Sequence, residues 1–485
     1  MSPVPKIRIS VCNDASPDAS GKFVLYWMIA ARRLSWNFGL DRAIEWARQL
    51  RKPLLIMEGL LCDYPWASER LHYFVIEGMA EKCCPQHRVS YYPFVEPSPG
   101  AGKGLLTALA AHACVVVTDE FPCFFLPGMI QNAARKLLVR FEAVDSNGLL
   151  PLRAASEAFS TAFSFRRFLQ KTLPVHLSES PCEHPLRRLE LPPLDSLLAE
   201  IAQKWPRTHC ENLKRPLFVT KLPIDHRVTA AVFVGGERAA RDALSKFLDD
   251  HLESYSAERN EPDRSATSGL SPYLHFGHIS VHEMFSTIVK RQGWSPEKIS
   301  LVPHGRRLDW WGLSPAVEEF FDQLITWREL GFNFSSHRSD CDRFESLPDW
   351  AKRTLTRHAR DERAHVYTLA DFASANTHDD LWNAAQRQLV REGRLHNYLR
   401  MLWGKKILEW SPSPQEAVEI MIDLNNRYAL DGRDPNSYSG IFWCLGRYDH
   451  PWGPERPILG TVRYMSSQNT TRKVSVKEYL RKYAS

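Results

Sequence analysis

Four tryptophans between residues 381 and 443 have types and spacing that could do chemistry: Trp382, Trp403, Trp410 and Trp443. Trp403 and Trp410 are seven residues apart, so they lie on one face if the segment between them is a continuous helix. An indole can fill a core, stack on a nucleic-acid base or relay an electron. The pattern alone leaves core packing and these chemical roles open.

Polar side chains lie between these aromatic residues, where a core would need none: Asn425, Asp431, Arg433, Asp434 and Asn436. Carboxylates can accept hydrogen bonds from the hydroxyl groups of a ligand. The same residues can instead cap a helix or pair with one another within the turn DGRDPN. Both a ligand site and a solvated turn are therefore compatible with this stretch.

The composition is that of a globular protein with two or three domains, with 485 residues, 44% of them hydrophobic and 24% charged. A net charge of +6 permits nucleic-acid binding without requiring it. The ten cysteines form no CxxC pair, which argues against a zinc site and a disulfide scaffold and favours a reducing cytoplasm. We find no apolar run of about 18 residues and no secretory signal, so we expect no contact with a membrane.

Residues 1–150 alternate between strand-like and helical patterns. Single helices between buried strands predict a doubly wound parallel sheet with helices on both faces. Ligands of such sheets bind at the carboxyl ends of strands, so the loops after Met28, Asp119 and Asp145 are candidate binding loops. The predicted strands are 23–28, 53–59, 89–94, 114–120 and 139–146.

The rest of the chain divides into a connector and a helical domain. Prolines cluster between residues 151 and 230, which predicts a long connector with short helices. Residues 231–485 carry helical periodicity and no strand-like alternation of any length. The sequence SPSP after Trp410 is expected to end the helix that contains Trp403.

Several long motifs resemble the photolyase/cryptochrome family, most closely its class II cyclobutane pyrimidine dimer photolyases. They are LSPYLHFGHIS (270–280), THDDLWNAAQ (377–386), MLWGKKILEW (401–410) and LNNRYALDGRDPNSYSG (424–440). With weaker similarity towards the N-terminus, the resemblance spans nearly the whole chain. It implies an α/β domain followed by an all-α domain that binds FAD.

The resemblance also implies residues for the cofactor. Asn425 would face the flavin N5, and the backbone after Ser268 would offer N–H groups to the pyrophosphate. The three tryptophans Trp382, Trp403 and Trp410 match the family's route for electrons between the flavin and the surface. The implied FAD-binding residues are Tyr255, Ser268, Leu270, Ser271, Asn425, Asp431 and Asp434.

The substrate side matches the family less closely. Trp327 and Trp443 match the pair that clamps a flipped-out dimer, and Met401 matches a methionine near this pocket. The family's glutamate four residues before the first clamp tryptophan is replaced by Gln323, which can donate through its amide but cannot give up a proton. The loop 444–456 after Trp443 is also changed. We expect DNA contacts from a basic rim that includes Arg447 in this loop, Arg463 beyond it, and Arg400, Lys405 and Lys406. The same residues could instead form a solvated helical face.

We therefore expect a FAD-dependent enzyme, a monomer, that uses blue light to split cyclobutane pyrimidine dimers flipped out of double-stranded DNA. We predict no metal site and no protein partner, and a cytoplasmic location on the nucleoid. An antenna chromophore of deazaflavin or folate type is expected in the N-terminal domain, but no residue identifies it. The altered pocket leaves an alternative open: a cryptochrome-type photoreceptor, or a flavin enzyme for another lesion or a non-DNA substrate.

Overall fold

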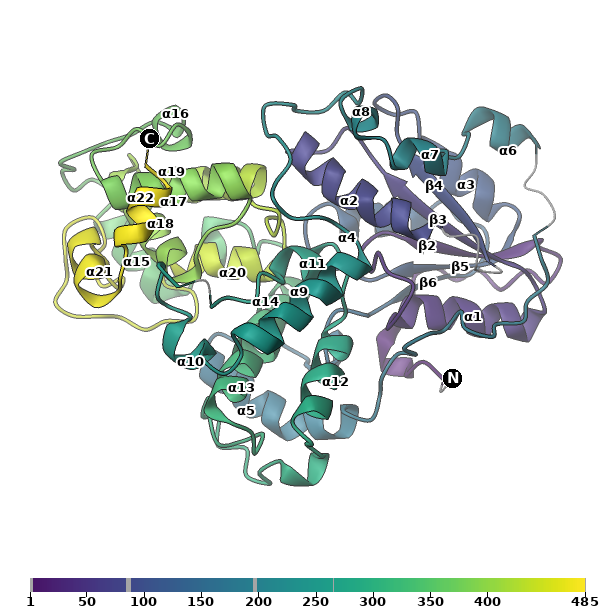
Figure 1. The fold of residues 1–485 in the computed structure, drawn as a ribbon, viewed down its shortest axis with the longest axis horizontal. Helices are drawn as coiled ribbons and strands as arrows, with labels where there is room; N and C mark the ends of the chain where they lie inside the picture. The colour runs from purple at the N-terminus through teal and green to yellow at the C-terminus, as the bar shows by residue number, and fades with distance from the viewer. Residues whose placement is uncertain (1–2, 84–88, 195–198, 265, 485) are drawn as a thin grey trace. The chain divides into compact units, whose positions relative to one another are not determined.

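The computed structural model describes residues 3–83, 89–194, 199–264 and 266–484 (Figure 1). The chain forms two compact units that alternate along the sequence. The first contains residues 1–154, 173–244 and 270–294, and the second contains residues 155–172, 245–269 and 295–485. The predicted boundaries at residues 150 and 230 describe domains that follow one another along the chain. In the structure, the first unit also contains the later segments 173–244 and 270–294.

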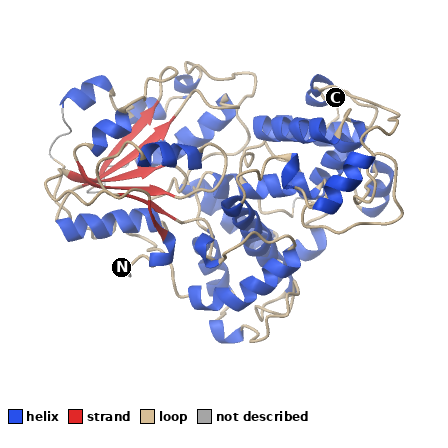
Figure 2. Ribbon diagram, turned by 180° about the vertical axis from the view of Figure 1, so that it is seen from behind, coloured by secondary structure: helices blue, strands red, loops and turns tan. Residues whose placement is uncertain are grey.

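A six-stranded sheet forms the centre of the first unit, with the strand order β1-β6-β5-β2-β3-β4 (Figure 2). The five strands β6 to β4 in this order are parallel, which confirms the doubly wound parallel sheet. The sequence analysis missed the edge strand β1, which pairs antiparallel with β6. The strands are β1 (Ile9–Val11), β2 (Phe23–Met28), β3 (Leu54–Leu60), β4 (Ser90–Val95), β5 (Ala113–Asp119) and β6 (Phe141–Val144).

Burial on both faces explains the composition of the central strands. Every residue of β2 and β5 is buried, as expected for parallel strands covered by helices on two sides. Asn37 begins the first helix by accepting hydrogen bonds from the N–H groups of Gly39 and Leu40. The helices between the strands are α1 (Phe38–Leu50), α2 (Glu69–Lys82), α3 (Leu105–Ala110) and α4 (Leu126–Ala134).

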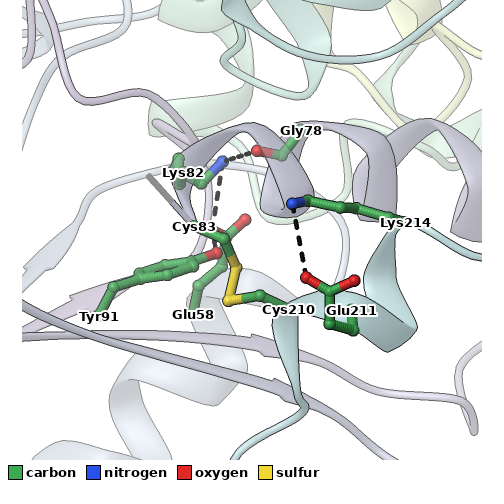
Figure 3. Close-up of a disulfide and its surroundings, with 8 residues drawn as sticks. All are labelled: Glu58, Gly78, Lys82, Cys83, Tyr91, Cys210, Glu211 and Lys214. Carbon is green, nitrogen blue, oxygen red and sulfur yellow. Dashed lines mark hydrogen bonds and ion pairs between the residues drawn. A yellow bond between two sulfur atoms is a disulfide. The ribbon is translucent and has the colours of Figure 1, made fainter. Parts of the chain in front are cut away.

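One disulfide in the first unit was not anticipated. Cys83, at the end of α2, is bonded to Cys210, at the start of α7 (Cys210–Leu213), across 127 residues of sequence (Figure 3). Close to this bridge, Lys82 forms an ion pair with the buried Glu58, which also accepts a hydrogen bond from Tyr91. The bridge fastens a short helix of the predicted connector to α2.

The second unit is helical, as the sequence predicts. A large hydrophobic cluster forms its core and includes Trp382, Trp403 and Trp410. Its main helices are α5 (Ala162–Thr172), α13 (Pro315–Phe321), α14 (Arg328–His337), α15 (Asp349–Arg357), α17 (Asp380–Glu392), α18 (Asn397–Trp410), α19 (Pro414–Tyr428), α20 (Pro435–Trp443), α21 (Ser467–Lys473) and α22 (Lys477–Lys482).

Neither a membrane-spanning helix nor a cluster of metal-ligating side chains occurs among the described residues. None of their helices is long and apolar enough to cross a membrane. No group of three or more His, Cys, Asp or Glu side chains among them is placed to hold a metal ion.

Candidate functional site

Four helices of the second unit, α17 to α20, position most of the predicted site. The helix α18 ends at Trp410, where the SPSP sequence was expected to stop it, and Ser413 and Pro414 then begin α19. Asp379 caps α17 through the N–H of Trp382 at 2.9 Å. The next residue, Asp380, is the first residue of α17, where a carboxylate complements the positive end of the helix dipole.

The three predicted relay tryptophans are buried and near one another. The Trp382 indole N–H donates to the carbonyl of Trp403 at 3.0 Å, and the ring centroids of Trp382 and Trp410 are 6.1 Å apart. The indole N–H of Trp403 donates to Gln386 at 2.8 Å. Buried indoles at this separation suit both core packing and electron transfer.

Two residues without a predicted role, Tyr367 and His378, pack against the ring of Trp410. The ring centroid of Tyr367 is 5.7 Å from that of Trp410, and the ring centroid of His378 is 4.9 Å away. The Tyr367 hydroxyl also lies 2.7 Å from Nδ1 of His378. The motif THDDLWNAAQ contains His378, but nothing in its spacing places it against Trp410.

The polar residues among the tryptophans pair with one another and with neighbouring helices. Asn425 is buried on α19 and donates from its amide to Ser437 of α20 at 2.7 Å. Asp431 pairs with Arg400 of α18 at 3.3 Å. Asp434 accepts a hydrogen bond from the N–H of Asn436 at 2.8 Å and thereby caps α20. The capping role that the sequence allowed for Asp434 is therefore present in the fold.

The remaining predicted FAD residues are divided between the two units. Tyr255 is buried in the second unit, where its ring packs edge-on against Phe320 at 5.4 Å. Ser268 belongs to the same unit, whereas Leu270 and Ser271 belong to the first, where Ser271 begins α11 (Ser271–His275). Their convergence on one cofactor stays a prediction.

Buried donors beside this cluster fit a cofactor with carbonyl and phosphate oxygens. Within the part of the chain that the structure describes, Arg400 Nε and Gln386 Nε2 are buried and have no hydrogen-bond partner. Arg400 is ion-paired with Asp431, and Gln386 holds the indole of Trp403. A buried donor without a partner is unfavourable, so donors of this kind favour a bound acceptor. The residues present are thus compatible with FAD.

The predicted lesion residues Gln323 and Trp327 share a π-helical segment, η5 (Asp322–Trp327), between α13 and α14. Segments of this wider turn occur frequently at functional sites. The Trp327 indole donates to Asp322 at 3.1 Å, and Asp322 pairs with Arg166 at 2.8 Å. Both side chains, Gln323 and Trp327, are half-buried. The structure thus fixes the orientation of the Trp327 indole through a buried carboxylate.

The second clamp residue, Trp443, is the last residue of α20 and is half-buried. The guanidinium carbon of Arg463 is 5.5 Å from the Trp443 ring centroid and 4.0 Å from that of Trp452. Arg463 is held by Asp449 at 3.1 Å and keeps 38% of its side chain exposed. Its position beside a clamp residue and at the surface agrees with the predicted DNA contact.

The other predicted DNA contact, Arg447, requires a correction. Only 2% of Arg447 is exposed, and its guanidinium packs on the rings of Phe334 and Phe442 at 4.2 and 3.9 Å. It donates to the carbonyl of Cys341 at 2.8 Å, and burial lowers its pKa to about 10. The sequence showed a basic residue in the changed loop, but it did not show that the loop turns this side chain into the core.

Two of the loops predicted to bind a ligand in the first unit, those after Met28 and Asp119, form hydrogen bonds with each other. Asp119, at the end of β5, accepts hydrogen bonds from the N–H groups of residues 29–31 at 2.9, 2.8 and 2.9 Å, and from the Tyr26 hydroxyl at 2.6 Å. Converging N–H groups form a typical anion site. Because a carboxylate of the chain already fills it, this group of donors is not free for a ligand.

Sequence comparison finds relatives along nearly the whole chain. It is 36% identical over 474 residues to the deoxyribodipyrimidine photo-lyase of Methanothermobacter thermautotrophicus, covering 98% of this chain and 97% of the relative. The enzymes of the same name from Arabidopsis thaliana and Potorous tridactylus are each 31% identical, over 94% and 96% of this chain and 88% and 82% of theirs. No family model matches the chain.

The fold agrees with these relatives. A crystal structure of a bacterial class III photolyase from Agrobacterium tumefaciens matches with a TM-score of 0.65 at 17% identity, covering 96% of this chain and 86% of that one. The architecture, a parallel sheet domain and a helical domain, is therefore that of the photolyases. Given the identity to its curated relatives, the chain belongs to the deoxyribodipyrimidine photolyases of the photolyase/cryptochrome family.

Proposed function

We propose that this protein repairs cyclobutane pyrimidine dimers in DNA under blue light, as a class II-type photolyase. The observation that carries the proposal is the 36% identity to a deoxyribodipyrimidine photo-lyase along 98% of the chain. When bound and reduced, FAD supplies the light-excited electron that splits the dimer. The residues of the chain bind and orient the dimer, hold the cofactor and exclude water.

Each part of the second unit has a role in this proposal. Trp327 and Trp443 stack on the flipped-out dimer, Met401 lines the same pocket, and Gln323 donates a hydrogen bond to it. Asn425 sets the redox state of the flavin, and the three buried tryptophans of α17 and α18 pass electrons towards it. The cofactor is further held by Tyr255, Ser268, Leu270, Ser271, Asp431 and Asp434.

DNA binding rests on the surface guanidinium of Arg463, which replaces the pair of arginines expected from the sequence. The Arg463 guanidinium packs on the exposed ring of Trp452, so Trp452 belongs to the same proposed DNA-binding surface. A single protein chain suffices, and the reaction takes place on chromosomal DNA in the cytoplasm. An antenna chromophore of deazaflavin or folate type remains part of the proposal without an assigned residue.

The glutamine at position 323 favours a second candidate, a cryptochrome-type photoreceptor that retains FAD and the tryptophan relay. Binding of a duplex that carries one dimer distinguishes the two functions in the dark. A photolyase binds this duplex more tightly than an undamaged one, with an affinity that falls as salt rises. Equal, weak binding of both duplexes, with light-driven reduction of the flavin intact, would favour the photoreceptor.

A further inference from the structure

Lys405 of α18 is a buried lysine that forms no hydrogen bond or ion pair with the residues that the structure describes. Only 1% of it is exposed, and within the part of the chain that the structure describes its Nζ has no hydrogen-bond partner. The adjacent Lys406, also buried, shows the usual solution, because its Nζ pairs with Glu409 at 2.6 Å. An ammonium has three donors and is unfavourable in a low-dielectric interior unless it is paired. Lys405 therefore stands out from its neighbour on the same helix.

The Lys405 ammonium faces Trp443. Its Nζ is 5.2 Å from the centroid of the Trp443 ring, a distance typical of a cation–π contact. Met401 is one helical turn earlier on α18 and so lies on the same face. The helices approach closely here, because a Cβ on Gly404 would come within 2.5 Å of Cys444 Sγ. Two residues assigned to the lesion pocket, Met401 and Trp443, thus converge with Lys405.

A second cation, Arg463, lies 5.5 Å from the same ring centroid, so the indole of Trp443 is under the field of two positive charges. The two cations differ in whether a carboxylate pairs with them. Arg463 is paired with Asp449, whereas Lys405 is not. A fixed, unpaired cation in a dry site acts strongly on charge that appears nearby during a reaction, since little solvent screens it.

We propose that Lys405 is an electrostatic residue of the lesion pocket, whose ammonium stabilises the negative charge on the dimer after the dimer receives an electron. This inference rests on the proposed function, in which the dimer stacks on Trp443. The dimer gains one electron, the two bonds that join its pyrimidines break, and the same electron returns to its donor. Lys405 gives up no proton in these steps and lowers the free energy of the charged dimer before splitting.

The protonation of Lys405 gives the inference a pH signature. Burial lowers the pKa of Lys405 to about 8. Among the groups that face it, burial raises the pKa of the Cys444 thiol to about 11, well above this range. The other facing cations are the guanidinium groups of Arg463 and Arg400. Burial raises the pKa of Asp449, but hydrogen bonds from Arg463, the His450 N–H and Trp452 together hold it below its usual value. Lys405 is thus the facing group expected to change charge near pH 8.

The test compares single-turnover splitting of one dimer in a duplex by protein whose FAD was reduced beforehand, at saturating DNA. We expect Lys405→Met to lower the splitting yield per absorbed photon about tenfold, with the dissociation constant for the dimer duplex changed less than about twofold. In the wild type the yield should fall as pH rises through about 8, and Lys405→Arg should remove this fall, because a guanidinium does not titrate.

Lys406→Met is the matched control, since it removes a buried lysine from the same helix. Lys406 contacts the relay residue Trp410, but prior reduction of FAD makes the relay unnecessary in this assay. The splitting yield of Lys406→Met and its pH profile should therefore follow those of the wild type. An unchanged yield in Lys405→Met overturns the inference, and so does a change in dissociation constant alone. If Lys405→Met does not fold, the test compares how the splitting yield of the wild type and of Lys405→Arg depends on pH. Identical pH profiles for these two proteins would overturn the inference. A wild type that splits no dimer contradicts the proposed function itself.

Discussion

At the scale of single residues, the site combines groups whose roles the sequence could suggest with groups that only the fold reveals. Trp382, Trp403 and Trp410 were assigned from a motif, and the structure places all three in one buried cluster. Burial does not distinguish a relay from a core, because an indole in either role needs the same packing. Kinetics on variants can make this distinction.

Replacing Trp403 tests the relay. Trp403→Phe keeps an aromatic ring in the core but removes the more easily oxidised indole, so photoreduction of bound FAD should slow about tenfold or more, equal to about 1.4 kcal/mol or more in barrier. The measurement is the rate of flavin bleaching under blue light with an external reductant. Trp350→Phe makes the same change in a residue packed against the same core and serves as the control. Unchanged photoreduction in Trp403→Phe would remove the relay assignment.

A substitution of Gln323 tests the proposed lesion pocket. Gln323→Glu restores an acid that can hydrogen-bond to the dimer and share a proton with it, so the splitting yield should rise by about threefold, within the modest range of one general acid–base group. The yield is measured with pre-reduced FAD at saturating duplex. No gain at any pH would mean that the pocket around η5 has been rebuilt for another ligand.

At the scale of elements, the loop after α20 shows why the sequence assigned one arginine wrongly. Gly446 has a φ of +109°, and a Cβ there would lie 2.7 Å from the Trp350 ring, so the chain can turn here only with glycine. After this turn Arg447 enters the core and Arg463 stays at the surface. Neither the turn nor the burial is visible in the order of residues.

Substitutions of Arg447 and Arg463 should therefore change different properties, the first the stability of the fold and the second the affinity for DNA. Arg447→Ala should lower the free energy of unfolding by about 3 kcal/mol, because it leaves buried partners unsatisfied, and should leave the salt dependence of DNA binding unchanged. Arg463→Ala should reduce the salt slope of DNA binding by about one and alter stability little. Denaturant unfolding and titrations at several salt concentrations measure both. A reduced slope in Arg447→Ala would restore the original assignment.

The last helix, α22, should detach in acid. Burial raises the pKa of Glu392 on α17, but hydrogen bonds from Lys482 and Tyr483 outweigh it and lower the pKa to about 2, below the usual 4.5. The carboxylate then stabilises the fold fully above pH 4.5, and this contribution is lost as pH falls towards about 2. Amide exchange in α22 at decreasing pH measures the loss, and Glu392→Gln should reduce its pH dependence in this range, with the remainder due to Asp263, which accepts a hydrogen bond from the N–H of Tyr479 in α22. Equal acid sensitivity in both proteins would contradict the assignment.

At the scale of the whole molecule, periodicity and turn signals predicted most of the fold. The five parallel strands, the helices between them and the end of α18 follow from local patterns. The strand β1 was missed because it has three residues, too few for an alternation to show. The bridge between Cys83 and Cys210 was missed because a pairing across 127 residues leaves no local signal.

The candidate site was predictable only in part for the same physical reason. The resemblance to the photolyase/cryptochrome family pointed to the tryptophans, the asparagine and the acids, all of which lie on α17 to α20 or the turn between them. Arg400 and Lys405 were predicted only as members of a basic rim, and Tyr367 was given no role. Their positions depend on burial, on the presence or absence of partners, and on neighbours distant in sequence. The two adjacent lysines within an otherwise apolar stretch, LWGKKILEW, were the one signal available for Lys405.

The central claim is that the second unit holds a pocket in which a cyclobutane dimer is split by light. The most direct measurement is blue-light repair of an oligonucleotide duplex with one dimer, by protein whose FAD has been chemically reduced beforehand. Prior reduction bypasses the tryptophan relay and tests the pocket alone. The account predicts loss of the dimer in the light and none in the dark. No loss in the light, with FAD bound and reduced, would contradict it.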